Sequence, residues 1–316
     1  MMSAAQKMTS TEQRIFRGVY AATVCPLRDD FSPDEVALAA HCRAVSEVRG
    51  IRGLLVNGHA GENFSLDRQE QNKVLEVVRR TVNSEQALIV GINHESSLEA
   101  ALQAKDAAAR GADALMVFPP NSWALSVAPE TIIAHHQLIL QASELPVFLY
   151  QAPVGSGAMA YSEAVILALV DMPQVVGIKE GSWEVARYEA NRRLVQQSAP
   201  HVAVMASGDE HLLTSFVLGT EGSIVSLAAL IPEVVVALYE AVQCGELKTA
   251  QAAHEIVYPL ARAIYGRDPA SHATARLKTC LKLIGVLESD RVRPPLGELD
   301  IDEVKALQKA LDHAGL

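Results

Sequence analysis

The chain has 316 residues, of which 49% are hydrophobic and 20% charged, a composition typical of a globular protein with a sizeable core. Its formal net charge of −10, without clustered lysines and arginines, disfavours a nucleic-acid-binding surface, since neutralising phosphates needs such clusters. No apolar run reaches the ~20 residues that span a bilayer, and the polar segment 1–14 lacks the apolar core of a secretory signal, so we expect a cytoplasmic protein with no membrane partner.

Short runs rich in valine, isoleucine and leucine recur along the first three quarters of the chain, each followed by a stretch with helical periodicity. The apolar runs predict strands at 19–24, 53–56, 87–92, 114–118, 146–150, 175–179, 202–206 and 223–226. The stretches between them, such as 33–48, 65–82, 96–110 and 162–170, predict amphipathic helices, the first with Ser32 as its N-cap. From about residue 232 the pattern is helical only, with segments near 232–243, 246–265, 270–287 and 301–313.

Eight strands, each followed by a helix, are what a closed (β/α)8 TIM barrel requires. A doubly wound open sheet that binds a nucleotide shows the same alternation. The turn after the first strand, residues 23–27, lacks the glycine-rich phosphate loop of that alternative. We therefore predict an α/β fold, with a (β/α)8 TIM barrel over residues 14–244 and a C-terminal helical appendix over residues 245–316.

Polar residues follow the predicted strands at the end where a parallel barrel carries its active site. Lys179 closes the apolar run 175–178, and burial there would lower the lysine pKa enough to leave a nucleophilic amine. A surface lysine paired with Glu180 is the alternative. Tyr150 ends the preceding strand, where its phenol could transfer protons, although most tyrosines at strand ends simply pack.

Two predicted turns add further polar groups. Residues 58–62 follow the second strand, and their two glycines permit a nest of backbone N–H groups that suits a carboxylate, or a plain turn. Asp209 and Glu210 follow the seventh strand and Ser226 ends the eighth. The two carboxylates could bind substrate hydroxyls, or they could cap the helix that begins at His211.

No metal site is indicated by the spacing of the possible ligands. His135 and His136 lie on a predicted helix, and no His-Glu-x-x-His segment occurs. The cysteines lack C-x-x-C spacing, which predicts free buried thiols at Cys25, Cys42, Cys244 and Cys280. We expect neither a metal nor a cofactor, and a carbon–carbon lyase without them must obtain its electron sink covalently, which points to a lysine.

Taken in order from Gly18 to about Leu311, these segments resemble the dihydrodipicolinate synthase and N-acetylneuraminate lyase superfamily of class I aldolases and dehydratases. The matching motifs are Gly-x-x-Gly-Glu at 58–62, Tyr-x-x-Pro-x-x-x-Gly at 150–157, Gly-Ile-Lys-Glu at 177–180, and Ser-Gly-Asp at 207–209 before Gly-Ser-Ile at 222–224. The resemblance implies a homotetramer without a cofactor. The site residues that it implies are Lys179 as the Schiff-base lysine, Tyr150 as proton donor and acceptor, Gly58 to Ala60 around the substrate carboxylate, Ile224 at the pyruvate end, and Asp209, Glu210 and Ser226 around the substrate tail.

The chain departs from the synthase pattern at four positions. His59 replaces a hydroxy amino acid, Ala60 a threonine, Asn121 a tyrosine that reaches across a subunit interface, and Gly155 the arginine that holds the semialdehyde carboxylate. We therefore expect His59 to take over part of the proton relay. The predicted function is aldol cleavage, condensation or dehydration of pyruvate or a 2-keto-3-deoxy sugar acid through an imine on Lys179. The alternatives are the synthase itself and a non-catalytic 2-oxo-acid sensor.

Overall fold

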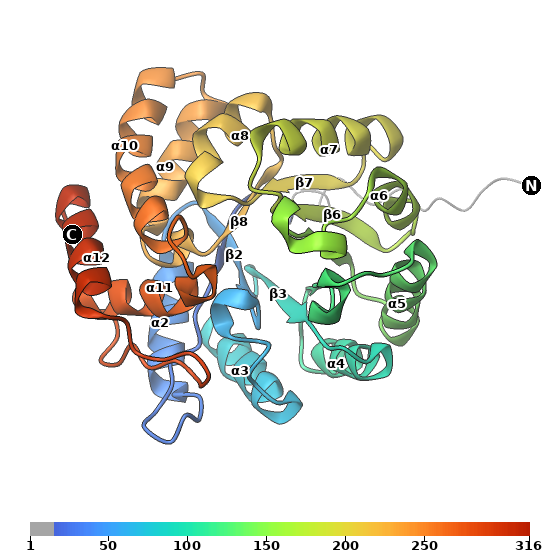
Figure 1. The fold of residues 1–316 in the computed structure, drawn as a ribbon, viewed down its shortest axis with the longest axis horizontal. Coiled ribbons are helices and arrows are strands. Elements are labelled where there is room, and N and C mark those ends of the chain that lie inside the picture. Colours follow the sequence, from blue (N-terminus) through green and yellow to red (C-terminus); the bar gives the residue numbers. More distant parts are fainter. Residues whose placement is uncertain (1–15) are drawn as a thin grey trace, which may run out of the picture.

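Eight parallel strands form the centre of the fold, and they pair in chain order until β8 closes the sheet against β1 (Figure 1). The computed structural model describes residues 16–316, so the polar segment 1–14 and the predicted domain start at residue 14 lie outside the described residues. The predicted (β/α)8 barrel is confirmed. The strands are β1 (Gly18–Ala22), β2 (Ile51–Val56), β3 (Ala87–Ile92), β4 (Ala114–Val117), β5 (Val147–Gln151), β6 (Val175–Glu180), β7 (Ala203–Ala206) and β8 (Gly222–Val225).

An outer ring of helices covers the strands, because a strand buried on both faces needs an apolar helix surface outside it. The ring comprises α2 (Glu35–Glu47), α3 (Arg68–Thr81), α4 (Ser97–Ala109), α5 (Pro129–Ala142), α6 (Glu163–Val170), α7 (Val185–Ser198), α8 (Leu212–Leu218) and α9 (Pro232–Gln243). Single 3-10 turns follow several strands, among them η1 (His59–Gly61), η2 (Asn121–Ala124), η4 (Asp209–His211) and η5 (Leu227–Ala229).

The start of α2 corrects one prediction. Asp34, not Ser32, is the N-cap, and its carboxylate accepts from the backbone N–H groups of Val36 and Ala37 at 3.0 and 3.1 Å. Ser32 instead donates to the carboxylate of Asp30 at 2.6 Å within the preceding turn. The helix begins later than predicted because the aspartate closer to the apolar repeat supplies the cap.

Two apolar layers hold the barrel together. One fills its interior and includes Tyr20, Phe148 and Ile224. The other lies between the strands and the surrounding helices. Side chains alternate between these layers along each strand, so consecutive residues at the end of β6 face opposite sides.

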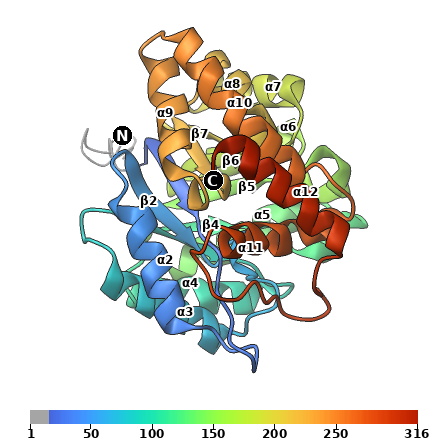
Figure 2. The same cartoon turned by 90° about the vertical axis from the view of Figure 1, so that its left-hand side faces the viewer.

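The C-terminal helices α10 (Leu247–Ile264), α11 (Ala273–Leu283) and α12 (Ile301–Ala314) form the appendix, with η6 (Ala270–His272) before α11. Helix α10 packs against α9 and α12, and α11 contacts η1 at the end of the barrel (Figures 1 and 2). The predicted division at residues 244 and 245 falls between α9 and α10, and it stays a prediction.

All four cysteines are free. Cys25, Cys42 and Cys280 are free and buried as predicted, whereas Cys244 is exposed because it caps the carboxyl end of α9 at the surface. Within residues 16–316, no helix is long and apolar enough to cross a bilayer.

Candidate active site

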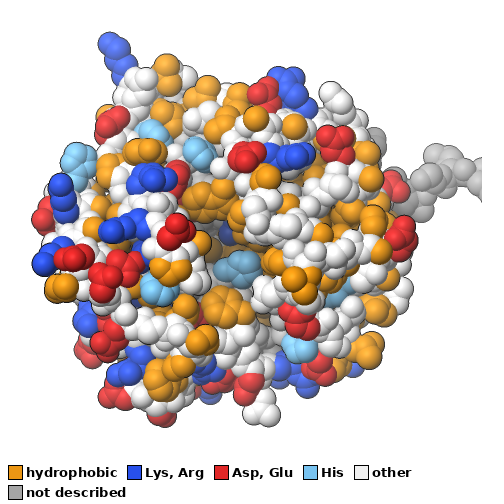
Figure 3. Space-filling model, viewed as in Figure 1, with side chains coloured by type: hydrophobic (Ala, Val, Ile, Leu, Met, Phe, Trp, Pro, Cys, Tyr) orange, Lys and Arg blue, Asp and Glu red, His pale blue; other side chains and the backbone are white. Residues whose placement is uncertain are grey.

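The main pocket lies at the carboxyl ends of the strands and has a volume of about 510 Å³. It is lined from the barrel by residues at the ends of β1, β2, β5 and β6 and after β7 and β8, and from the appendix by α11 and the segment before α12. Figure 3 shows a hollow near the centre of this face, with hydrophobic and histidine side chains inside it. The active-site end of a parallel barrel thus carries a cavity of ligand size.

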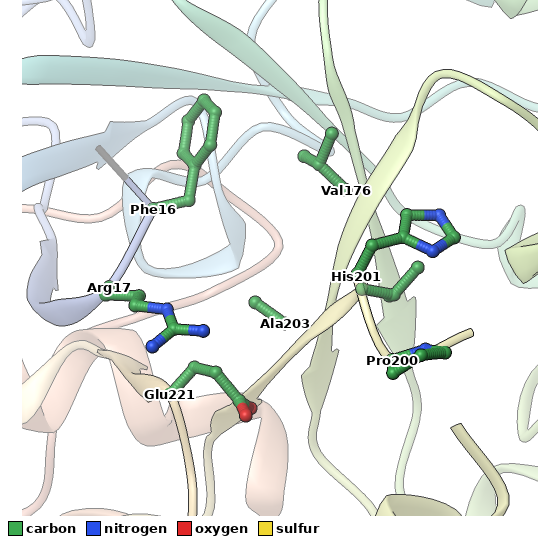
Figure 4. Close-up of a pocket in the computed structure, with 8 residues that line it drawn as sticks. Phe16, Arg17, Val176, Pro200, His201, Ala203 and Glu221 are labelled. Carbon is green, nitrogen blue, oxygen red and sulfur yellow. The ribbon is translucent and has the colours of Figure 1, made fainter. Parts of the chain in front are cut away.

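A second hollow lies at the opposite end of the barrel, where Phe16, Arg17, His201 and Glu221 surround it (Figure 4). Its volume is about 20 Å³, room for about one water molecule, so it cannot hold a keto acid.

Lys179, near the end of β6, points into the main pocket and is partly exposed there. Burial lowers the pKa of its ammonium group to about 8, while Asp209 acts in the opposite direction. Glu180 lies on the other face of the strand, where it accepts from Asn191 at 2.8 Å and from the Ser182 hydroxyl at 3.0 Å. The alternative of a surface lysine paired with Glu180 is therefore wrong.

The Tyr150 ring packs beside this amine, and the rings of His59 and Phe118 pack against Tyr150. The Tyr150 ring centroid lies 5.5 Å from Lys179 Nζ, and the His59 ring lies 5.3 Å from Tyr150 and 4.3 Å from Phe118, centroid to centroid. Burial raises the pKa of the Tyr150 phenol, so it stays protonated near neutral pH. Burial, helped by Lys179, lowers the pKa of His59 to about 3, which keeps the imidazole neutral.

Asp209 and Glu210 separate to different places. The buried Asp209 carboxylate lines the pocket and accepts from the backbone N–H of Leu227 at 3.0 Å. Burial raises the pKa of Asp209 to about 6, against the opposing effects of Leu227 and Lys179. Glu210 does not line the pocket but pairs with Arg262 of α10 at 3.1 Å. Neither carboxylate caps α8, which has no side-chain cap, so that alternative is wrong.

The remaining predicted residues fall on both sides of the pocket wall. Ala60, Asn121 and Ser226 line it, and the Ser226 hydroxyl lies 2.6 Å from the Tyr265 hydroxyl. Gly58 packs beneath Leu55, and Ile224 is buried in the barrel interior, so both shape the wall from behind.

Sequence reasoning missed a set of lining residues that includes Trp183, Tyr265, Thr274, Leu277 and Leu296. Trp183 comes shortly after β6, and its φ of 62° is unusual for a bulky side chain, a feature that tends to mark functional sites. The others belong to the appendix and its flanking loops. Among the described residues, no group of three or more histidine, cysteine or acidic side chains could hold a metal ion.

Comparisons with known proteins show the family of the chain. The model of the dihydrodipicolinate synthetase family matches residues 15–314. A probable mitochondrial 4-hydroxy-2-oxoglutarate aldolase of Emericella nidulans is 29% identical, over 76% of this chain and 78% of the relative. A 4-hydroxy-tetrahydrodipicolinate synthase of Methanopyrus kandleri is 28% identical, over 95% and 96%.

Solved structures share the fold. A prophage protein of the dihydrodipicolinic acid synthase family from E. coli K12, solved with pyruvate, has a TM-score of 0.87 at 24% identity and covers 95% of this chain and 99% of its own. The N-acetylneuraminate lyase of Fusobacterium nucleatum has a TM-score of 0.82 at 21% identity, over 94% and 98% of the two chains.

Proposed function

The chain belongs to the dihydrodipicolinate synthetase family and is a lyase, and we propose that it works through an imine between Lys179 and a 2-oxo acid such as pyruvate. The observation that carries the proposal is the Lys179 amine, which lies in the main pocket beside the Tyr150 phenol with a lowered pKa. With a pKa of about 8, about one tenth of the amine is neutral at pH 7. An unperturbed lysine would be neutral in only about one molecule in 2,500 at pH 7.

The proposed chemistry begins when the neutral amine attacks the substrate carbonyl carbon. The resulting carbinolamine loses water, and the protonated imine then accepts the electron pair released when a bond at C3 breaks. In aldol cleavage this bond is C3–C4: the C4 hydroxyl loses its proton, the aldehyde leaves, and the electron pair forms an enamine. Protonation of the enamine at C3 gives the pyruvate imine, and water then hydrolyses this imine to release pyruvate and the free amine. A protonated phenol such as Tyr150 can donate a proton to the carbinolamine hydroxyl and recover it later.

His59 acts in this scheme as an uncharged imidazole. An imidazole whose pKa is about 3 accepts a proton poorly near neutral pH, which favours hydrogen bonding to substrate over the proton relay expected from the sequence. The backbone N–H groups of His59 and Ala60 begin the 3-10 turn after β2 and have no acceptor within it, so they suit the substrate carboxylate.

The charges of the pocket favour an uncharged substrate tail. Among its described lining residues, Lys179 supplies the amine and Asp209 the carboxylate. A Cβ at Gly155 would meet only open space. A carboxylate at the far end of a substrate would therefore lack a cation among these lining residues. Asp209, Ser226 and Asn121 could instead bind hydroxyls, which supports pyruvate and a 2-keto-3-deoxy sugar acid as the substrate class.

The oligomeric state and the cellular location are also proposed. A homotetramer and a cytoplasmic location are what the resemblance and the composition suggest. Leu98 and Leu102, one turn apart on α4, are 69% and 41% exposed and would suit a subunit interface. Gel filtration with light scattering would give the mass in solution.

A panel of 2-keto-3-deoxy sugar acids tests the function, with pyruvate release measured by a coupled lactate dehydrogenase reaction. We expect turnover by the wild-type protein and its loss in Lys179→Arg, because a guanidinium stays protonated and cannot form the imine. Lys282→Arg, on the exposed side of α11, is the matched control and should keep full activity. Wild-type protein that binds 2-oxo acids without turnover would support the sensor alternative.

A further inference from the structure

Helix α11 carries two fully buried cations that the proposed mechanism does not use, Arg276 and Lys278. A buried charge is costly unless it is paired and hydrogen-bonded, so the partners of these side chains indicate what they hold in place. The same helix presents Thr274 and Leu277 to the main pocket. Its buried cations therefore lie directly behind the pocket wall.

Lys278 is paired with Glu62, which ends the turn after β2 and is also fully buried. Lys278 also donates to the backbone carbonyl of Arg291 at 2.8 Å. The second oxygen of Glu62 accepts from the backbone N–H of Arg293 at 2.9 Å. Glu62 is thus held from two sides by the appendix.

The backbone of this turn makes a further contact with α11. Glu62 adopts a left-handed conformation with φ of 56°, which is uncommon for a residue other than glycine. Its N–H donates to the carbonyl of His59 at 3.0 Å, and the Thr274 hydroxyl of α11 donates to that carbonyl at 3.3 Å. The conformation of residues 59–62 is therefore held both by a hydrogen bond within the turn and by contacts from α11.

Arg276 binds a second part of the pocket wall, the segment that follows α10. Its guanidinium donates to the carbonyls of Ile264, Arg267 and Asp268, at 3.3, 2.8 and 3.1 Å, and these flank the pocket residue Tyr265. Helix α11 thus joins two walls of the pocket that are far apart in the sequence.

We propose that Glu62 and Lys278 are positioning residues that hold the turn at 59–62 in the shape that binds the substrate carboxylate. This proposal rests on the proposed function, because it assigns the turn N–H groups to the carboxylate of the 2-oxo acid. The appendix then acts in substrate binding as well as in packing.

The test compares Lys278→Met, the double variant Glu62→Gln with Lys278→Met, and the control Lys282→Met. The control removes an exposed ion pair with Asp290 from the same helix. For each, cyanoborohydride trapping gives the pyruvate concentration at half-maximal labelling, and thermal unfolding gives Tm. We expect Lys278→Met to lower Tm and to raise the half-saturating pyruvate concentration by roughly ten- to a hundred-fold, because a small displacement of a binding group has effects of this size.

The double variant separates positioning from charge compensation, and it remains informative where Lys278→Met does not fold. Replacing both members of a buried pair removes the unpaired charge and should restore much of the Tm. The hydrogen bond from Lys278 to Glu62 is still missing, so the half-saturating pyruvate concentration should stay high, with the pH profile of Lys179 labelling unchanged. A double variant whose half-saturating pyruvate concentration equals that of the wild type would overturn the proposal. Failure of the proposed function would show separately, as no labelling of the wild type.

Discussion

Replacing Asp209 with asparagine should move the pH at which Lys179 becomes a nucleophile. The Asp209 carboxylate stabilises the ammonium form, so its removal lowers the pKa of Lys179 below its value of about 8. The neutral amine, which is the reactive form, then becomes more abundant at a given pH. The acidic limb of the labelling profile should therefore shift to lower pH in Asp209→Asn.

The wild-type profile has a shape that follows from the same pKa. The neutral fraction of an amine with a pKa of about 8 is about 1% at pH 6, about 10% at pH 7 and about one half at pH 8. Labelling at a low pyruvate concentration should rise about tenfold from pH 6 to 7, about fivefold to pH 8, and level off above pH 9. The Asp209→Asn profile should reach its plateau earlier.

The assay is the initial rate of cyanoborohydride labelling with pyruvate, measured by intact-protein mass at each pH. A wild-type limb near pH 10 would show that the pocket does not lower the pKa of the amine. A shift to higher pH in Asp209→Asn would contradict the electrostatic coupling between the two side chains.

Three further outcomes follow from the site. Tyr150→Phe should lower kcat by roughly 10²–10⁴ and leave labelling of Lys179 possible, since only proton transfer is lost; an unchanged kcat would remove the phenol from the mechanism. His59→Ala should raise KM for the keto acid with little change in kcat. A fall in kcat of roughly 10²–10⁴ would instead support a role for His59 in the proton relay. Condensation of pyruvate with aspartate semialdehyde should be very slow, because the semialdehyde carboxylate finds no cation in the pocket and its binding is weakened by on the order of 2–5 kcal/mol. Rapid formation of the cyclic product would contradict the proposal that the pocket takes substrates with an uncharged tail.

The barrel could be predicted because its signals are local. Each strand is an apolar run that is buried on both faces, and each is followed by a helix with its own periodicity. Helix starts are less well determined by the sequence, since Asp30, Ser32 and Asp34 all offer a capping oxygen. In the structure Asp34, the one nearest the apolar repeat, is the cap, and Asp30 binds Ser32 instead.

The part of the site built from strand ends was also visible in the sequence. Lys179 and Tyr150 end neighbouring strands, and alternation along β6 sends Lys179 inward and Glu180 outward. The different directions of Asp209 and Glu210 could not be foreseen, because they depend on Leu227 and Arg262 from other elements.

The appendix contribution was beyond sequence reasoning for a physical reason. Tyr265, Leu277 and Leu296 reach the pocket through long-range packing, and no local pattern marks a helix that folds back over a barrel. The buried pair of Glu62 and Lys278 joins residues 216 positions apart. Such contacts require the three-dimensional structure.

The most direct test of the account is the site of covalent labelling. Wild-type protein treated with pyruvate and borohydride, then digested and mapped by mass spectrometry, should carry the reduced pyruvate adduct on Lys179, and Lys179→Arg should carry none. Labelling should persist after exhaustive EDTA treatment. An adduct on a different lysine, or no adduct with any 2-oxo acid, would contradict the assignment of Lys179 as the imine-forming residue.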